Sequence, residues 1–192
     1  SFRSIFLKKS LKMRKYKKYS NKLSFKNKLA RFIWSSCWLI FFRPFNLPIF
    51  NFIRIFLLRI FGAKIGYGCK IQATVKIWAP WNLEIGNLVA FGANVLCYNP
   101  GKIIIRNKVA ISHGAHLCAA SHDYTKMSNP LATKKIIIND LSWIASEAFI
   151  GMGVEIGEGS VVGARSVVLK DIDAWSVVSG NPAKIIKKRI LQ

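Results

Sequence analysis

The C-terminal half of the chain carries six aliphatic residues at an unbroken interval of six: Ile138, Ile144, Ile150, Ile156, Val162 and Val168. A small residue recurs four places after most of them, and glycine often follows directly, as at Gly151, Gly157 and Gly163. An α-helix and a strand have much shorter periods, so neither explains a repeat of six. The spacing is that of a hexapeptide repeat, which winds a parallel β-helix with three hexads to a turn. We expect the aliphatic side chains to point into the axis of this solenoid.

The same spacing recurs upstream, with interruptions. One run begins at Ile65 and ends in a two-residue slip at Pro80-Trp81. From Leu117 to Ile138 the separation is 21 residues, which is not a multiple of six. We therefore predict that the polar stretch 121–135 is extruded as a loop. Loops that leave a regular scaffold often carry function.

Composition divides the chain into four parts. They are a basic and partly disordered tail over 1–28, an apolar and amphipathic helical segment over 29–62, an all-β solenoid over 63–173, and a strand, turn and short basic C-terminal helix over 174–192. The solenoid has room for about six turns of three hexads.

The segment ahead of the solenoid contains two apolar runs, over 29–42 and 50–61. Each is shorter than the roughly 18–20 apolar residues that a membrane-spanning helix needs. Arg54 and Arg59 interrupt the second run, a pattern that predicts an amphipathic helix with a cationic face. We expect the helices to cover the open end of the solenoid.

Positive charge is also concentrated ahead of the solenoid. Residues 1–83 hold 18 Lys and Arg and no Asp or Glu, whereas residues 84–192 hold 12 Lys and Arg and 8 Asp and Glu. This imbalance favours peripheral contact with an anionic membrane surface, at the inner face of the cell membrane. Nucleic-acid binding is not expected, because no known binding module accompanies the charge. The four cysteines form no CxxC pair, which is typical of a cytoplasmic protein, and Cys69 and Cys118 are expected to be small buried side chains.

Three segments resemble a known family. The stretch 143–187 is similar to the hexapeptide-repeat acyltransferases, and WAPWNLEIG (78–86), ASHDYT (120–125) and GARSVV (163–168) resemble the colanic acid biosynthesis acetyltransferases in particular. The resemblance covers about residues 29–189. It implies a left-handed β-helix, a homotrimer with active sites between subunits, and transfer of acetyl from acetyl-CoA to a sugar hydroxyl in exopolysaccharide or capsule assembly. The acceptor could be lipid-linked, which would suit a membrane-seeking N-terminus.

The resemblance also implies site residues. A sugar hydroxyl needs a base as it attacks a thioester, and histidine suits that task at neutral pH. His122 lies at the motif position of the catalytic base, with Asp123 or a backbone carbonyl as candidates to hold its tautomer. Tyr98, Asn99 and Asp123 are candidate acceptor contacts. The matching cofactor positions, with lysines facing the CoA phosphates, are Ser146, Ala164, Leu169, Lys170, Lys184 and Lys187.

Alternatives stay open at this point. Three histidines within ten residues, His113, His116 and His122, raise a zinc enzyme of the γ-type carbonic anhydrase kind. However, residues of one face stack only when about 18 apart, so these separations disfavour a tetrahedral site within one chain, and we expect no metal. A serine acetyltransferase-like enzyme, another acyl-CoA donor and a non-catalytic scaffold also remain.

Overall fold

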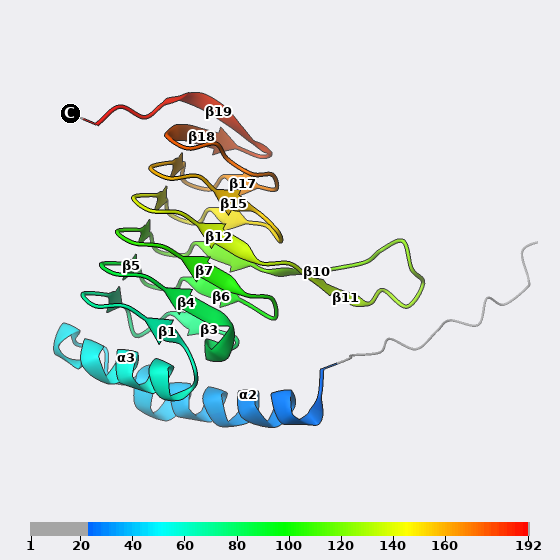
Figure 1. Cartoon of the computed structure of the whole chain (residues 1–192). Helices are drawn as coiled ribbons and strands as arrows, with labels where there is room; N and C mark the ends of the chain where they lie inside the picture. Colours follow the sequence, from blue (N-terminus) through cyan, green and yellow to red (C-terminus); the bar gives the residue numbers. More distant parts are fainter. Residues whose placement is uncertain (1–22, 192) are drawn as a thin grey trace, which may run out of the picture.

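The computed structural model describes residues 23–191. Figure 1 shows a stack of short strands wound into a prism, with helices across its N-terminal end and one arm leaving its side. The helical segments are α2 (Phe25–Cys37), which continues through the π-helical η1 (Trp38–Phe42), then the 3₁₀ turn η2 (Pro48–Phe50) and α3 (Asn51–Ile60). The expected basic tail over 1–28 lies mostly outside the described residues. Its last part belongs to α2, because Ser24 caps the helix by accepting the backbone N–H of Asn27.

The strands form three parallel faces, each joined coil to coil. The first face contains β1 (Lys64–Ile65), β4 (Leu83–Ile85), β7 (Ile103–Ile105), β12 (Ile136–Ile138) and β15 (Glu155–Ile156). The second contains β2 (Lys70–Ile71), β5 (Ala90–Phe91), β8 (Ala110–Ile111), β13 (Trp143–Ile144) and β16 (Val161–Val162). The third contains β3 (Lys76–Ile77), β6 (Leu96–Tyr98), β9 (His116–Cys118), β14 (Phe149–Ile150) and β17 (Val167–Val168). This arrangement confirms the predicted β-solenoid.

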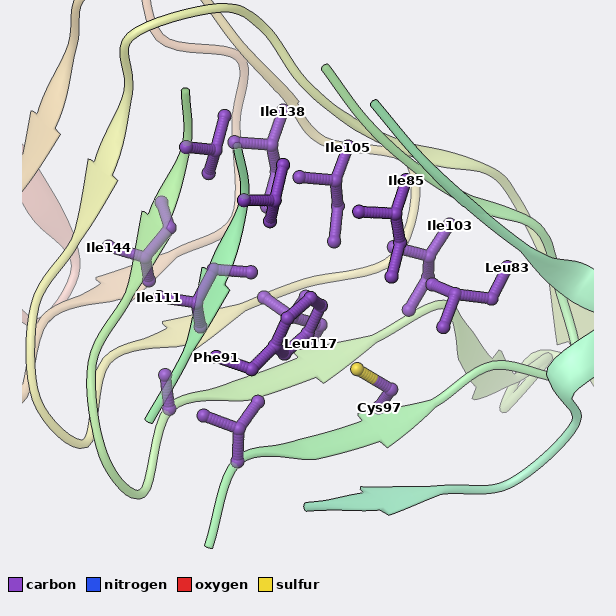
Figure 2. Close-up of a cluster of buried hydrophobic side chains, with 14 of the residues drawn as sticks. Leu83, Ile85, Phe91, Cys97, Ile103, Ile105, Ile111, Leu117, Ile138 and Ile144 are labelled. Carbon is purple, nitrogen blue, oxygen red and sulfur yellow. The ribbon is translucent and has the colours of Figure 1, made fainter. Parts of the chain in front are cut away.

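The core is a set of stacked apolar columns, one behind each face (Figure 2). The repeat residues from Ile138 to Val168 are all at most 1% exposed, as the period of six predicts. Coil length is not uniform: Ile85 pairs with Ile105, 20 residues on, whereas Ile138 pairs with Ile156, 18 residues on. Each longer coil has two additional residues at a corner. In the first coil they form part of the 3₁₀ turn η3 (Pro80–Asn82).

The extruded loop is an antiparallel arm. Its strands are β10 (Ala120–His122) and β11 (Leu131–Thr133), and they leave the prism just after β9 (Figure 1). Gly101 lies at the root of the arm, where an added Cβ would come within 2.6 Å of the Ala119 carbonyl oxygen. The backbones therefore meet there at a distance that only glycine allows.

Side chains from the helices close the N-terminal end of the solenoid. The first coil exposes strand carbonyls that have no preceding coil to bind them. Trp34 and Trp38 donate their indole N–H groups to the Ile77 and Val75 carbonyls, at 2.6 and 2.8 Å. Asn51 both donates to the Cys69 carbonyl and accepts the N–H of Ile71. The expected covering role of the helices is thus seen in direct hydrogen bonds.

The predicted cationic face of the second helix is wrong for Arg54, whereas Arg59 is exposed as expected. Arg54 is only 2% exposed and donates to the carbonyls of Ile71 and Phe45. Arg59 reaches the Ile65 carbonyl at 2.7 Å. Both guanidinium groups point toward the solenoid because its open edge offers acceptors, and burial lowers the pKa of Arg54.

The C-terminal segment forms a hairpin instead of the expected basic helix. β18 (Ser176–Gly180) extends the second face beyond β16, and β19 (Ala183–Lys188) pairs antiparallel with it. The turn between them is at Asn181-Pro182, as expected, and that peptide bond is cis. Strand pairing wins over helix here because β18 presents an open edge that β19 can satisfy. Beyond the hairpin, Arg189 donates to the Leu141 and Gly159 carbonyls and fastens the end to two lower turns.

Candidate active site

His122 ends strand β10 on the extruded arm, opposite Leu131 of β11. The arm follows β9 directly, so it starts at the edge where the chain leaves the third face. The side chain is half-buried. The antiparallel pairing gives the histidine a fixed backbone, in contrast to an irregular loop.

The ring of His122 is held by a backbone carbonyl. Its Nδ1 lies 2.8 Å from the carbonyl oxygen of Asn129. A carbonyl can only accept, so Nδ1 of a neutral ring must carry the proton and Nε2 is the basic nitrogen. Of the two predicted ways to hold the tautomer, Asp123 and a backbone carbonyl, the structure has the carbonyl.

Asp123 is occupied within the arm. Its Oδ1 accepts the hydroxyl of Thr125 at 2.5 Å, and its Oδ2 lies 2.9 Å from Nζ of Lys126. These hydrogen bonds, first from Thr125 and then from Lys126, lower the pKa of the carboxyl group. Asp123 therefore stabilises the turn at the tip of the arm, and the structure does not show it next to the imidazole.

A second group of predicted residues lines the corner between the second and third faces. Ser146 sits between β13 and β14, and Ala164 sits one coil further, between β16 and β17. The Ser146 carbonyl accepts the N–H of Arg165, which fixes the two coils in register. Ser146 Oγ also lies 3.1 Å from Nδ1 of His113, one coil earlier. Ser146 is half-buried and Ala164 is exposed at this corner.

An ion pair braces the same corner. Nε of Arg165 lies 2.5 Å from a carboxylate oxygen of Glu147, and this contact lowers the pKa of Glu147. Both residues have a positive φ, 58° for Glu147 and 56° for Arg165. Side chains other than glycine rarely adopt that conformation. Arg165 thus combines a positive φ with a cross-coil ion pair.

A cavity of about 370 Å³ lies where the chain leaves the third face at the top of the solenoid. Leu169 and Lys170 line one side of it, and Pro182, Ala183 and Lys184 of the terminal hairpin line the other. The predicted cofactor residues thus lie at both edges of the third face: Ser146 and Ala164 at the corner entering it, Leu169 and Lys170 at the corner leaving it.

Lys184 and Lys187 project from the same face of β19. Lys184 pairs with Ser179, and Lys187 pairs with Val177, because a bulge between Val177 and Val178 shifts the register. Both of these pairs flank the buried Val178 and so point outward. Lys184 borders the cavity, and Lys187 lies beyond it along the strand.

Tyr98 and Asn99, the weaker acceptor candidates, have different surroundings. The Tyr98 ring packs edge-on against Trp78 at 5.8 Å between centroids, and the guanidinium of Arg31 covers Trp78 at 3.8 Å. Asn99 is fully buried, and its amide both donates to the Ala79 carbonyl and accepts the Ala79 N–H. Asn99 therefore fixes a corner of the fold, while Tyr98 belongs to an aromatic cluster on the third face.

The three histidines do not share a ligand position. His113 contacts Ser146, His116 packs edge-on against Phe149 with its Nε2 buried, and His122 contacts Asn129. Burial lowers the pKa of His116. Within residues 23–191 no group of three or more His, Cys, Asp or Glu side chains is placed to hold a metal ion.

Two site features were not found from the sequence. The Asn129 carbonyl acts through backbone geometry, which no residue type in the loop over 121–135 indicates. Arg31 lies about 50 residues before its partner Trp78, and a cation–aromatic contact at that distance leaves no local pattern.

Comparison with known proteins gives a consistent answer. A scan against models of protein families finds no match. The chain is 42% identical over 137 residues to the "Putative colanic acid biosynthesis acetyltransferase WcaF" of Escherichia coli K12, covering 71% of this chain and 75% of that protein.

Solved structures share the architecture. The hexapeptide-repeat acetyltransferase VCA0836 from Vibrio cholerae, in complex with acetyl-CoA, superposes with a TM-score of 0.77 at 26% identity, over 87% of this chain and 91% of that one. A maltose O-acetyltransferase from Clostridium difficile gives 0.74 at 25% identity, over 88% and 90%. No helix among residues 23–191 is long and apolar enough to cross a bilayer. The hexad columns, the arm and these similarities together show that the chain is a left-handed β-helix and belongs to the hexapeptide-repeat acetyltransferases.

Proposed function

We propose that the protein is an acetyl-CoA-dependent O-acetyltransferase that acts on a sugar hydroxyl in exopolysaccharide or capsule assembly. The observation that carries this proposal is the contact of His122 Nδ1 with the Asn129 carbonyl, which makes Nε2 the basic nitrogen. The name of the WcaF relative and the acetyl-CoA bound to VCA0836 support the donor and the pathway class.

The reaction needs one proton carrier. Nε2 of His122 accepts the proton of the sugar hydroxyl as the oxygen attacks the thioester carbonyl. The tetrahedral intermediate collapses with cleavage of the C–S bond, and the imidazolium returns its proton to the departing CoA thiolate. The Asn129 carbonyl keeps the ring oriented and stabilises the imidazolium by accepting from Nδ1. A backbone N–H of a neighbouring coil supplies the oxyanion contact.

We assign the donor to the outer side of the third face, between its two corners. Ser146 and Ala164 leave backbone groups open to the amides of the pantetheine arm, with Leu169 and Lys170 flanking the same arm. Lys184 and Lys187, which point outward from one face of β19, supply cations for the CoA phosphates. The resemblance implies these roles, and the placement of Leu169, Lys170 and Lys184 around one cavity supports them.

The active form is assigned as a homotrimer with sites between subunits. The arm carries His122 away from the coils of its own chain (Figure 1). In such an assembly the histidine of one subunit would complete the donor site of the next.

The acceptor is assigned as a sugar, free or lipid-linked, and the location as cytoplasmic with peripheral contact to an anionic membrane. The edge-on Trp78–Tyr98 pair on the third face offers an aromatic wall of the kind that packs on sugar rings. The 18 cations and absent acids of residues 1–83 support the anionic surface as a partner.

Thiol release from acetyl-CoA, measured with the full chain against a panel of saccharides, tests the proposal. We expect release with at least one saccharide and its near loss in His122→Ala. Absence of acetyl-CoA binding by calorimetry would overturn the proposal. Acyl transfer that proceeds normally in His122→Ala would overturn the assigned base.

A further inference from the structure

We propose that the helices at the N-terminal end of the solenoid carry an apolar membrane-docking face, which seats the enzyme in the interface of a phospholipid bilayer. The face consists of the exposed apolar side chains of residues 25–60, here called the apolar base. This inference sharpens the membrane partner named in the proposed function, and it rests on that function only for the use of a lipid-linked acceptor.

The first part of the apolar base is a stripe along α2. Phe25, Leu29 and Phe32 are 78%, 49% and 71% exposed, and their spacing places them on one side of the helix. Trp34 and Trp38, on the other side, donate to carbonyls of the first coil. The face of α2 that turns away from the solenoid is therefore apolar, where a helix packed on a soluble core normally presents polar side chains.

The second part is a stripe along α3, where apolar side chains lie on the outer face and a cation lies on the face toward the solenoid. Phe52, Phe56 and Ile60 are spaced four apart and are each more than 60% exposed. The opposite face holds Leu58, which is fully buried, and the buried Arg54 with its backbone carbonyl partners. The helix thus turns a cation inward and phenylalanines outward, an arrangement that suits an apolar medium outside.

The connection between the helices continues the same surface. Ile40 and Phe41 of η1 and Leu47 and Ile49 around η2 are between 53% and 71% exposed. Monomeric soluble proteins rarely expose so many large apolar side chains in one region, and such surfaces mark contact with a partner or a membrane. The helices lie together across one end of the prism (Figure 1), so the exposed side chains belong to a single end of the molecule.

Charge favours a lipid surface over a second copy of the chain as the occupant. Lys26, Lys28 and Arg43 are exposed among the apolar side chains, and no acidic residue occurs before Glu84. If the apolar bases of two copies of the chain packed against each other, their Lys and Arg side chains would come together with no carboxylate from this segment to offset the charge. A bilayer accepts the apolar side chains and places phosphate groups beside the cations, which is the usual pattern of interfacial helices.

The bound orientation follows from the geometry. With the apolar base in the bilayer, the solenoid stands away from the surface, and the terminal hairpin with its cavity is at the far end (Figure 1). The arm leaves from the third coil, between these ends. A sugar carried on a membrane lipid would then approach the arm from the base, while acetyl-CoA would reach the donor site from the solvent side.

Vesicle flotation of the full chain tests the inference. Vesicles of phosphatidylcholine alone and of phosphatidylcholine mixed with phosphatidylglycerol are compared, with Phe52→Ser/Phe56→Ser as the test variant and Ile186→Ser/Ile190→Ser at the far end as the matched control. We expect the wild type to float with both vesicle types, and more strongly with the anionic ones. The test variant should lose at least about tenfold in partition coefficient, and the control should lose little.

Controls keep the outcomes separate. Circular dichroism and acetyl-CoA affinity of the Phe52→Ser/Phe56→Ser variant should match the wild type, which distinguishes loss of docking from loss of the proposed function. If the wild type floats with neither vesicle type, or if both double variants lose binding equally, the inference is overturned. It is also overturned if the test variant instead loses an oligomer seen by size exclusion, since a second copy of the chain would then occupy the face.

Discussion

The two ends of the solenoid close their open strand edges with different elements. Each end would expose strand edges and apolar columns if left open. At the N-terminal end, helices donate indole, amide and guanidinium N–H groups to the first coil and leave apolar side chains outside. At the C-terminal end, the hairpin β18–β19 continues the sheet and leaves Lys184 and Lys187 outside, together with the exposed Ile186 and Ile190.

The difference shows that closing a solenoid does not determine the character of its outer surface. A strand cap offers alternate positions for cations, which suits an anionic cofactor on the outward face. A helical cap offers a stripe of side chains at each turn, and here the stripe is apolar. The proposed chemistry lies between the two caps, on an arm that belongs to neither.

The largest expected effect tests whether the catalytic step on the arm is separate from the two caps. His122→Ala should lower kcat by about 10²–10⁴ while acetyl-CoA affinity stays near the wild-type value, because the imidazole acts on the acceptor proton and not on the donor. Steady-state thiol release with calorimetric binding measures both quantities. Met127→Ala, a change of an exposed residue on the same arm, is the control. A comparable kcat loss in the control would assign the effect to the arm as a whole.

The next effect compares the two caps directly. Arg54→Met should lower the free energy of unfolding by about 2 kcal/mol, because it leaves the buried Ile71 carbonyl of the first coil and the Phe45 carbonyl unpaired. Arg189→Met should cost about 1 kcal/mol, since the Arg189 residue is only half-buried and water can replace part of its hydrogen bonds. Urea denaturation followed by circular dichroism measures both. Equal losses of unfolding free energy in the two variants would show that the buried Arg54 and the half-buried Arg189 stabilise their ends of the solenoid equally.

A smaller effect concerns the C-terminal cap alone. Lys184→Ala should weaken acetyl-CoA binding by about threefold to tenfold at low salt, and the loss should shrink as salt rises, since an exposed cation acts on phosphate through a screened interaction. Calorimetric titration at two ionic strengths checks this. Lys70→Ala, which removes an exposed cation near the opposite cap, should leave affinity unchanged. A salt-independent loss would mean that Lys184 contributes by packing.

The last test needs no substitution and compares the reactivity of two cysteines. Cys97 is fully buried in the core, and burial raises its pKa to about 12, whereas Cys37 in α2 is half-buried. At pH 8 we expect a thiol reagent to modify Cys97 more than about 10³-fold more slowly than Cys37, as read by peptide mass spectrometry. Similar rates would show that the helical cap and the coils open together as one unit.

The inner columns could be predicted because the period of six has one structural meaning. Ile144 and Ile150 had to face the axis once the repeat was recognised, and both are fully buried. Cys97 occupies the same kind of position, but a cysteine within an interrupted run carries no aliphatic signal. Cys69 is buried as expected, whereas Cys118 is half-buried on the outer side of the third face. The winding hand came from the resemblance and not from the spacing.

The errors at the two caps share a physical cause. The alternation of Arg54 and Arg59 with apolar residues gives two faces, but the sequence does not say which face meets a row of unpaired carbonyls. Likewise, the basic segment around Lys184 has no strong local preference, and β18 decides its conformation. For the site, His122 followed from its motif, while the carbonyl that orients it depended on how the arm folds back.

The number of coils below the arm determines how far the arm lies from the helical end of the solenoid. Adjacent strands of a sheet are spaced by about 4.8 Å, and three coils separate the helical end from the root of the arm. In an enzyme seated on a bilayer, the root of the arm would therefore lie roughly 10–15 Å above the helical layer, a reach fixed by rigid stacking. Adding or deleting one complete coil below the arm would raise or lower that reach in a single step, so that the repeat number itself becomes a ruler for the length of the lipid-borne substrate.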